Sequence, residues 1–270
     1  MKLAVSNIGW TADQDASIAR ALLDAGAEAL EVAPGRVFSD VAAATEKDAQ
    51  AIRAHWAAQG LPIVSMQALL FGQPDLRMFG SPEQVTEFET YLAHVMSLAG
   101  ALGCGPLVFG SPVNRKRGDL DLGDACEIAE PIFRRIGDIA RATGTCFCIE
   151  ANATGYGCDF LTRLDEAAEM VRRVDHPNVG LVLDTGNMMM AEEDPAAIQA
   201  ALPLIRHVHF SAPQLAPITP HEDYIRAILE GLKSADYKGH VTLEMRAGDT
   251  SEPFFDSLKT LRHLVDEVAA

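Results

Sequence analysis

Short apolar segments alternate with longer amphipathic segments along the whole chain. The short segments are rich in β-branched residues and are flanked by turn residues, which is typical of buried strands. We expect strands over residues 3–8, 29–33, 63–67, 107–109, 145–150, 179–184, 205–210 and 240–244. The longer segments carry apolar residues at helical spacing, and we expect helices over 15–25, 45–59, 82–102, 122–142, 163–174, 195–201, 221–235 and 251–268.

These segments form eight strand–helix pairs within 270 residues. A repeated strand–helix unit implies a parallel sheet with helical crossovers. Because no segment is left for a second domain, we predict a single (β/α)8 TIM barrel over residues 1–270. An open doubly wound sheet is the alternative, but the segment that follows the first strand, Ile8-Gly9-Trp10-Thr11-Ala12, is not a glycine-rich phosphate loop.

Loop length is concentrated after three of the predicted strands. The longest irregular stretches, residues 69–81, 110–123 and 211–220, follow the third, fourth and seventh strands. In a barrel these connections lie on the C-terminal face, where active sites are built. We therefore expect the chemistry of this protein at that face.

Four consecutive predicted strands end in a charged or titratable residue. Glu150, Asp184, His209 and Glu244 stand at the ends of the fifth to eighth strands, separated by 34, 25 and 35 residues. Interior positions of a strand are expected to be apolar, and a single charged residue at a strand end would usually be a cap or a loop-facing side chain. Four in phase predict that the side chains meet at the mouth of the barrel.

Three carboxylates that meet there repel one another and need a cation. One imidazole cannot neutralise them, whereas a divalent metal ion can. Carboxylate oxygens with one imidazole suit Mn²⁺, Mg²⁺ or Co²⁺ better than a structural Zn²⁺, which prefers thiolates. The sequence therefore predicts one bound divalent metal, with Mn²⁺ as the leading candidate.

The strand-end residues and their surroundings resemble the xylose-isomerase-like barrels, in particular the sugar phosphate isomerase/epimerase group that includes ketose 3-epimerases. The resemblance covers nearly the whole chain and rests on Glu150, Leu183-Asp184-Thr185-Gly186, His207-Val208-His209 and Leu243-Glu244-Met245-Arg246. It implies that Glu150, Asp184, His209 and Glu244 hold one divalent metal, and that Glu150 and Glu244 flank the substrate as the acid/base pair. It also implies a small-molecule sugar or sugar phosphate as substrate. Relatives are often dimers or tetramers, so a homo-oligomer is an open expectation.

Two positions depart from the pattern of the ketose epimerases. In many relatives a histidine that contacts substrate or a second metal lies three residues after the metal-binding aspartate; this chain has Asn187 there, which we take as a candidate for substrate binding. The loop after His209 also lacks the arginine that ketose epimerases use for substrate. These departures weaken the assignment to ketose epimerases without affecting the broader isomerase class.

Several further residues are candidates for substrate binding. Arg246 and Asn152 each lie two residues from a predicted ligand and so on its face of the strand; a salt bridge and a loop contact are the alternatives. His207 is in phase with His209 but one layer deeper, which favours a hydrogen-bonded or packed histidine. Trp10, with Phe71 and Phe79, follows a predicted strand and either walls the pocket or packs in its loop.

The loop after the fourth strand contains the basic run Arg115-Lys116-Arg117. On an acidic protein such a run either clamps a phosphate or carboxylate of the substrate, with Arg115 as the candidate, or forms a solvated loop tip.

The charge and composition of the chain limit the classes of molecule that it is expected to bind. The formal net charge is −16, from 22 basic and 38 acidic residues, so nucleic acid and anionic membranes are poor general partners. No apolar run approaches the roughly 18 residues of a membrane helix, and the first residues do not form an export signal. An odd set of five cysteines fits reduced thiols, so we expect a cytoplasmic protein.

The predicted function is metal-dependent isomerisation or epimerisation of a sugar. A carboxylate would remove a proton next to a metal-polarised carbonyl and form an enediolate. A lyase or dehydratase acting on a polyol or keto-sugar begins with the same proton abstraction and stays open. A non-catalytic sugar-binding barrel is less favoured. An abasic-site endonuclease is remote, because it needs more histidines and a basic groove.

Overall fold

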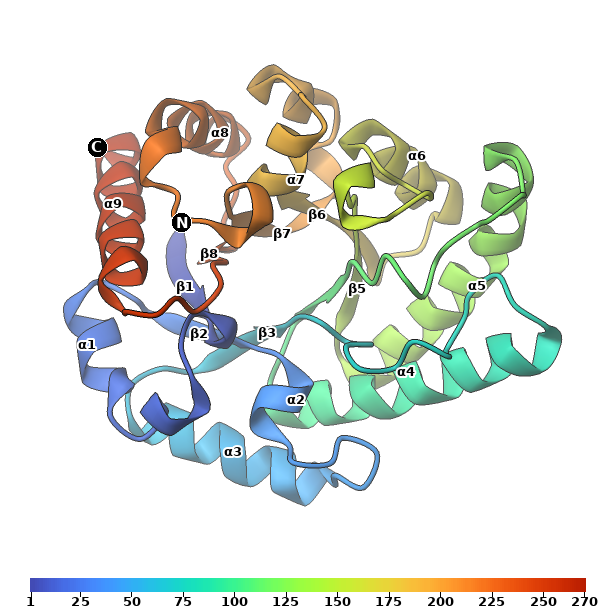
Figure 1. The fold of residues 1–270 in the computed structure, drawn as a ribbon, viewed down its shortest axis with the longest axis horizontal. Coiled ribbons are helices and arrows are strands. Elements are labelled where there is room, and N and C mark those ends of the chain that lie inside the picture. Colours follow the sequence, from blue (N-terminus) through green and yellow to red (C-terminus); the bar gives the residue numbers. More distant parts are fainter.

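The computed structural model describes residues 1–270, and its eight parallel strands close into a barrel in chain order. The strands surround a common axis, and β1 pairs with β8 to close the ring (Figure 1). They are β1 (Lys2–Ser6), β2 (Ala29–Val32), β3 (Ile63–Met66), β4 (Pro106–Phe109), β5 (Cys146–Glu150), β6 (Val179–Asp184), β7 (Ile205–Phe210) and β8 (His240–Leu243). The predicted (β/α)8 barrel is confirmed, and the open sheet is excluded.

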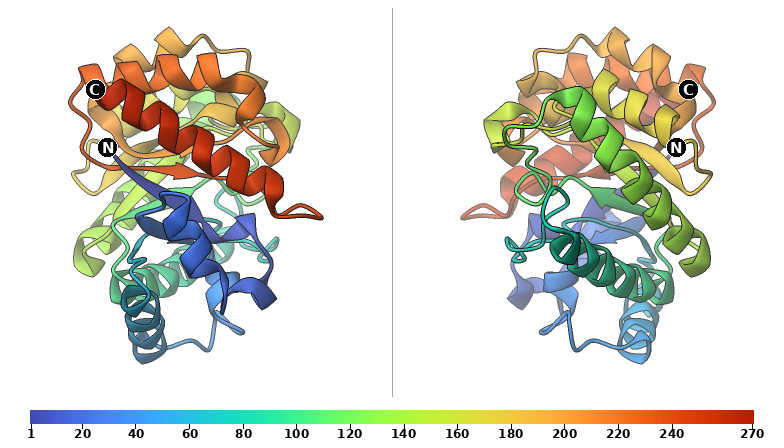
Figure 2. Two further views of the ribbon diagram at one scale, coloured as in Figure 1. Left: turned by 90° about the vertical axis from the view of Figure 1, so that its left-hand side faces the viewer. Right: turned by 90° about the vertical axis from the view of Figure 1, so that its right-hand side faces the viewer.

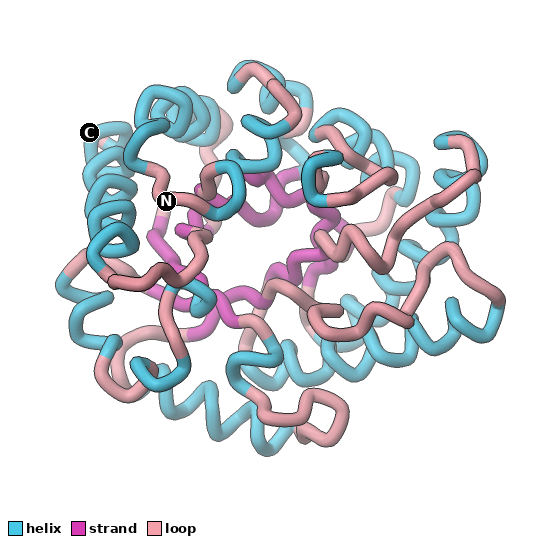
Figure 3. The backbone as a smooth tube through the Cα atoms, viewed as in Figure 1, coloured by secondary structure: helices cyan, strands magenta, loops and turns pink.

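The helices form an outer ring around the strands, as Figure 3 shows. They are α1 (Ile18–Asp24), α2 (Pro34–Val37), α3 (Glu46–Ala58), α4 (Pro82–Leu102), α5 (Leu122–Thr143), α6 (Leu164–Val174), α7 (Thr185–Met190), α8 (Glu222–Ser234) and α9 (Glu252–Ala269). No helix is long and apolar enough to cross a membrane.

Most elements lie within a few residues of their predicted bounds, but the segment after β6 differs. The helix expected over 195–201 is a 3₁₀ helix, Pro195–Ala200, and the α-helix of this unit is the six-residue α7. α7 begins directly at the strand end, because the Asp184 carboxylate accepts a hydrogen bond of 2.6 Å from the Asn187 backbone N–H. A helix this short has no apolar repeat to reveal it, and the same holds for α2.

The interior of the barrel changes character along its axis. Two residues before the ends of β5 and β6, Cys148 and Val182 form a small apolar cluster with Val108 of β4, and Cys146 packs against it. Nearer the C-terminal ends the buried side chains are polar, and they include Glu31 and the four predicted ligands.

The long loops predicted at the C-terminal face follow β3, β4 and β7 as expected. Figure 2 shows the barrel from two sides, with the segment between β8 and α9, in red, projecting beyond the neighbouring loops. Because all eight strands are parallel, every loop that follows a strand lies at the same end of the barrel.

Candidate metal and substrate site

The four predicted metal ligands meet at the C-terminal end of the barrel. Glu150 ends β5, Asp184 ends β6, His209 lies in β7, and Glu244 directly follows β8. All four are buried, and the backbones of Asp184 and His209 are direct partners in the β6–β7 pairing. Adjacent strands of one closed sheet thus bring together residues that are far apart in the sequence.

The side chains converge on one nitrogen of His209. His209 Nδ1 lies 3.3 Å from Glu150 Oε1, 3.3 Å from Glu244 Oε2 and 3.7 Å from Asp184 Oδ2. This nitrogen is fully buried and has no hydrogen-bond partner. A buried polar atom without a partner is costly, so an unpartnered nitrogen among three carboxylates needs an explanation.

The other ring nitrogen of His209 is held by a residue that the sequence analysis did not identify. Glu31 in β2 lies with its two oxygens 3.0 and 3.1 Å from His209 Nε2. It also accepts from His207 Nε2 at 2.7 Å and from Ser65 Oγ at 2.9 Å. An ionised carboxylate can only accept, so both histidines carry their proton on Nε2. When the imidazole is neutral, the lone pair of His209 Nδ1 therefore points toward the three carboxylates.

The pKa shifts show how strongly these charges interact. Burial would raise the pKa of the Glu31 carboxyl, but His209 and His207 outweigh it and hold the pKa well below its usual range. Burial, followed by the charges of Glu150 and Glu244, raises the pKa of Asp184 to about 8. Burial would lower the pKa of His209, but the carboxylates around it, with Glu31 and Glu244 foremost, raise it well above its usual value. The site thus attracts positive charge, as a proton or as a metal ion.

Two groups of side chains could in principle hold a metal, and they share His209. In the group of Glu31, His207 and His209, the nitrogens already donate to the carboxylate at hydrogen-bond distance. In the group of Glu150, Asp184 and His209, extended by Glu244, the imidazole nitrogen is unsatisfied. Three carboxylates and one imidazole nitrogen are suitable ligands for a divalent cation, so the residues present fit a metal here.

A close contact between two loops holds Asp184 in place. Asp184 Oδ2 accepts from Ser211 Oγ at 2.8 Å, and the same hydroxyl accepts from the Gly186 backbone N–H at 2.9 Å. A Cβ on Gly186 would lie 2.4 Å from Ser211 Oγ and 2.9 Å from the carbonyl oxygen of Ala212. Only glycine allows the α7 backbone to approach the loop after β7 this closely.

A cavity of about 220 Å³ opens beside the candidate ligands. Its wall includes Glu150, Asp184 and Glu244, together with Asn152 and Asn187. Tyr156 also lines it; burial and the nearby Asp184 raise the pKa of this phenol to about 12, so it is a neutral hydroxyl. The cavity therefore presents acids, amides and a hydroxyl to a small polar molecule.

Asn152 and Asn187, both expected to contact substrate, line the cavity. Asn152 Nδ2 donates to Glu150 Oε2 at 2.8 Å, and Asn187 Oδ1 accepts from the Ala153 backbone N–H at 2.9 Å. Arg246 is exposed, and its backbone N–H donates to the Leu215 carbonyl at 3.1 Å. Its side chain makes no salt bridge with a carboxylate, so the alternative considered for it does not apply.

Other candidates lie away from the cavity. His207 lies against Glu31, one layer below the ligands, as its position in β7 suggested. Trp10 is buried against Phe254 and donates from its indole to Asp15 at 2.6 Å. Phe79 packs edge-on against Phe160, and Phe71 is 87% exposed. The aromatic residues are therefore loop packing or surface, and they do not wall the cavity.

Both alternatives considered for Arg115, a clamp on the substrate and a solvated loop tip, are wrong. Its side chain is fully buried and is absent from the cavity wall, whereas Lys116 is exposed. Arg115 Nη2 donates to the backbone carbonyl of Glu150 at 2.7 Å and to Asn152 Oδ1 at 3.1 Å. It lies behind the site residues and supports them, so it does not reach a ligand in the cavity directly.

Glu31 is the main site residue that the sequence analysis missed. It stands within the predicted strand 29–33, between apolar neighbours. The rule that singled out Glu150, a charged residue in an apolar strand, also applies to Glu31. Glu31 differs from Glu150 in that it lies inside its strand and does not end it.

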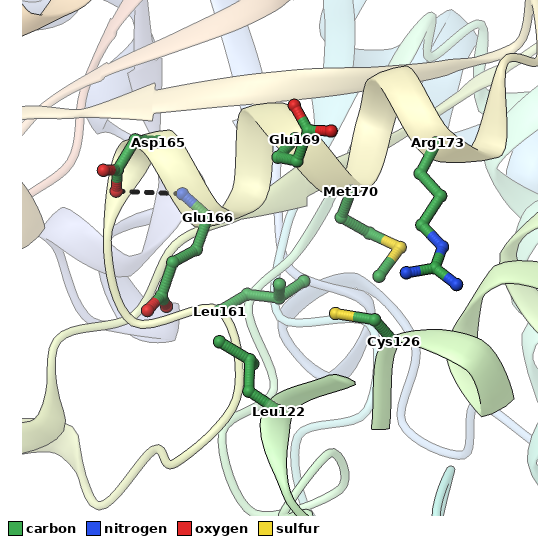
Figure 4. Close-up of a pocket in the computed structure, with 8 residues that line it drawn as sticks. All are labelled: Leu122, Cys126, Leu161, Asp165, Glu166, Glu169, Met170 and Arg173. Atoms are coloured by element: carbon green, nitrogen blue, oxygen red, sulfur yellow. Dashed lines mark hydrogen bonds between the residues drawn. The ribbon is translucent and has the colours of Figure 1, made fainter. Parts of the chain in front are cut away.

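A second, larger hollow of about 320 Å³ lies on the outside of the barrel between α5 and α6 (Figure 4). Leu122, Cys126, Leu161 and Met170 contribute apolar surface, while the acidic side chains at its edge come from α6. It contains no group of ligands comparable to those around His209. The chemistry of the molecule is therefore concentrated in the barrel mouth.

Comparisons with known proteins agree with this architecture. The model of the family described as xylose isomerase-like TIM barrel matches residues 19–264. No curated protein matches the chain. Several solved structures share the fold at low sequence identity. D-psicose 3-epimerase from Clostridium cellulolyticum H10 superposes with a TM-score of 0.78 and 17% identity, covering 100% of this chain and 98% of that one.

Two further structures are similar to a comparable extent. The 3-keto-D-glucoside 4-epimerase YcjR from E. coli has a TM-score of 0.77 and 18% identity over 97% of this chain and 99% of its own. The IolI protein, solved with a bound zinc atom, has a TM-score of 0.73 and 16% identity over 99% and 98% of the two chains. At these identities the structures support the fold, and the family model supports the assignment. The chain belongs to the xylose isomerase-like TIM barrel family.

Proposed function

We propose that this protein is a divalent-metal-dependent sugar isomerase or epimerase, with Mn²⁺ as the leading candidate metal. The observation that carries the proposal is the unpartnered Nδ1 of His209, which faces carboxylate oxygens of Glu150, Asp184 and Glu244 at 3.3–3.7 Å. The chemistry of this donor set fits a dication, and the neighbouring polar cavity fits a small hydroxylated substrate. Family membership and the sugar epimerases of the same fold support the choice of a sugar.

The metal would be held by Glu150, Asp184, His209 and Glu244, and when bound it would supply a Lewis acid that polarises a substrate carbonyl. The proton chemistry belongs to the carboxylates. Glu150 and Glu244 come from different strands and approach the cavity from either side of His209, each with an oxygen 3.3 Å from Nδ1. One of them would remove the proton from the carbon beside the carbonyl, which leaves an enediolate.

The outcome depends on where the proton returns. Return to the neighbouring carbon exchanges aldose and ketose, whereas delivery from the opposite carboxylate to the other face of the same carbon inverts that centre. Asn152 Nδ2 donates a hydrogen bond of 2.8 Å to Glu150 Oε2, which fixes the orientation of this carboxylate. Asn187 and Tyr156 offer an amide and a neutral hydroxyl to substrate oxygens.

Proton exchange with solvent tests the proposal directly. Protein loaded with Mn²⁺ is incubated in D₂O with a panel of ketoses and aldoses, and NMR follows deuterium incorporation at carbon. We expect deuterium at the carbon next to a carbonyl for at least one sugar. In Glu150→Gln and in Glu244→Gln, exchange should fall by about 10²- to 10⁴-fold, the usual contribution of a positioned acid or base.

Glu127→Gln is the matched control, because Glu127 is exposed on α5, outside the barrel. It should retain full exchange. Full exchange in both site variants would refute the roles of Glu150 and Glu244. A dehydrated product would reassign the protein as a lyase, and Mn²⁺ binding without exchange into any sugar would indicate a binding protein.

A further inference from the structure

Arg115 is fully buried next to the site, yet no carboxylate lies within salt-bridge distance of it. Burying an unpaired charge is expensive, so such a residue persists where its contacts compensate for the cost. All its hydrogen bonds leave from Nη2, to Glu150 O, to Asn152 Oδ1 and, at 3.5 Å, to Leu161 O. Nε and Nη1 have no partner. The two shorter contacts of Arg115 are therefore directed to the strand end that carries Glu150.

The chemistry of the guanidinium determines the direction of the hydrogen bonds that follow. Arginine has donors and no acceptor, so Asn152 must present its oxygen to Arg115. The amide nitrogen of Asn152 then points the other way and donates to Glu150 Oε2 at 2.8 Å. If the Asn152 amide rotated by 180°, its NH₂ group would face the N–H donors of Arg115, and its oxygen would face the carboxylate of Glu150. Neither pair could form a hydrogen bond. Arg115 thus allows one orientation of the Asn152 side chain.

The backbone after β4 packs against the hydrogen-bonded side chains of Glu150 and Asn152. A Cβ on Gly110 would lie 2.6 Å from Glu150 Oε2 and 3.0 Å from Asn152 Oδ1. The carboxylate and the amide are therefore packed against bare backbone on one side. The guanidinium carbon of Arg115 lies 5.7 Å from the centre of the Phe109 ring, which limits its own movement.

We propose that Arg115 is a positioning residue that fixes the Asn152 amide and, through it, the orientation of the Glu150 carboxylate. The inference rests on the proposed function, because it concerns one of the residues assigned to the metal. According to this proposal, Arg115 affects the metal site through Asn152, so that its effect disappears when Asn152 is replaced. A residue that only fills space would affect the site independently of Asn152.

Binding of Mn²⁺ alone, without a sugar, tests this coupling. The affinity is measured by electron paramagnetic resonance of free Mn²⁺ for the wild type, Arg115→Met, Asn152→Leu and the double variant. Arg115→Met keeps a long side chain and removes the donors, and Asn152→Leu keeps the shape of the amide. Each single variant should bind Mn²⁺ about 10- to 100-fold more weakly, as is typical when a residue that orients a metal ligand is removed.

The double variant decides between coupling and packing. If Arg115 acts through Asn152, adding Arg115→Met to Asn152→Leu should weaken binding by less than about 2-fold further. Multiplication of the two single effects would overturn the proposal, as would wild-type affinity in Asn152→Leu. Asn152→Leu leaves Arg115 in place, so it remains informative even if Arg115→Met does not fold.

Arg117→Met is the matched control from the same loop. Arg117 is half-buried and bonds to Asp159 and Leu120, with no contact to Glu150 or Asn152. It should bind Mn²⁺ as the wild type does; a loss equal to that of Arg115→Met would contradict the inference. Failure of the wild type itself to bind Mn²⁺ would refute the proposed function, so the two failures are distinguishable.

Discussion

At the scale of single residues, His209 connects two charge systems that face opposite sides of its ring. Nε2 donates to Glu31, and Nδ1 faces the three carboxylates at the cavity. A histidine that donates one nitrogen to a carboxylate and offers the other to a metal is a common arrangement in metal sites. Glu31 therefore determines which nitrogen of His209 is free to bind a cation.

Replacing Glu31 with Gln tests this role. The amide is uncharged, and its NH₂ group would replace one of the two oxygens that lie 3.0 and 3.1 Å from His209 Nε2, so it no longer presents two acceptors to this nitrogen. We expect Mn²⁺ affinity to fall by about 10- to 100-fold. Nitrogen-15 NMR of the histidine side chains, with a diamagnetic divalent cation such as Mg²⁺ bound, should show His209 protonated on Nε2 alone in the wild type and a mixture of tautomers in Glu31→Gln.

Glu28→Gln is the control, because Glu28 lies just before β2, at the other end of the barrel, and accepts from the Leu3 backbone N–H. Its Mn²⁺ affinity and its histidine spectrum should match the wild type. An unchanged His209 spectrum in Glu31→Gln would show that Glu31 does not select the tautomer.

At the scale of elements, the site depends on how short helices begin at strand ends. α7 starts immediately after β6, and its first turn is pressed against the loop that follows β7. The Ser211 hydroxyl links the Gly186 N–H to the Asp184 carboxylate, so this contact also positions a candidate ligand. The absence of a side chain at Gly186 is what allows the two segments to meet.

Gly186→Ala should therefore destabilise the protein by about 1–3 kcal/mol, the usual cost of overpacking. Gly35 is the matched control, since it occupies the corresponding position in α2, and a Cβ there would meet nothing within 4 Å. Gly35→Ala should be neutral or stabilise by about 0.4–1 kcal/mol. Urea denaturation of the two variants measures the difference, and equal stabilities would contradict the close contact at Gly186.

The sequence was informative about elements where local periodicity is strong. The bounds of β6, β7 and α4 coincide with the predicted ranges, and the other strands differ by one or two residues. It missed α2 and α7, because one or two turns contain too few residues to show a period. It located the helical segment over Pro195–Ala200 but not its 3₁₀ geometry.

At the scale of the whole molecule, closing the barrel concentrates negative charge. β5 to β8 each contribute one candidate ligand, and burial removes the water that would screen the carboxylates. The raised pKa of Asp184, about 8, results from burial and from this repulsion. Without a cation, the folded state therefore carries an electrostatic cost that the unfolded chain does not have.

Metal binding should relieve that cost and stabilise the fold. At a free Mn²⁺ concentration 100 times the dissociation constant, mass action contributes about 2.7 kcal/mol, which for a chain of this size corresponds to a rise in Tm of about 5–10 °C. A chelator should reverse the rise. The shift should shrink as the pH falls, because protons compete with the metal for the same ligands.

Thermal melts of the wild type and of Asp184→Asn, with and without Mn²⁺, measure this effect. The variant lacks one candidate ligand and should show a smaller rise in Tm. An Mn²⁺-dependent rise as large in the variant as in the wild type would place the bound metal elsewhere.

The sequence by itself determined the barrel and the four residues at its mouth. The local periodicity of apolar residues predicts the alternation of strands and helices. The parallel topology then brings the C-terminal end of every strand to one face of the barrel. The tertiary structure alone decided what surrounds those residues. Glu31 meets His207 across 176 residues of chain, and a basic loop residue, Arg115, is buried behind Glu150. Such contacts depend on which side chains the closed barrel places opposite one another, and no local pattern carries that information.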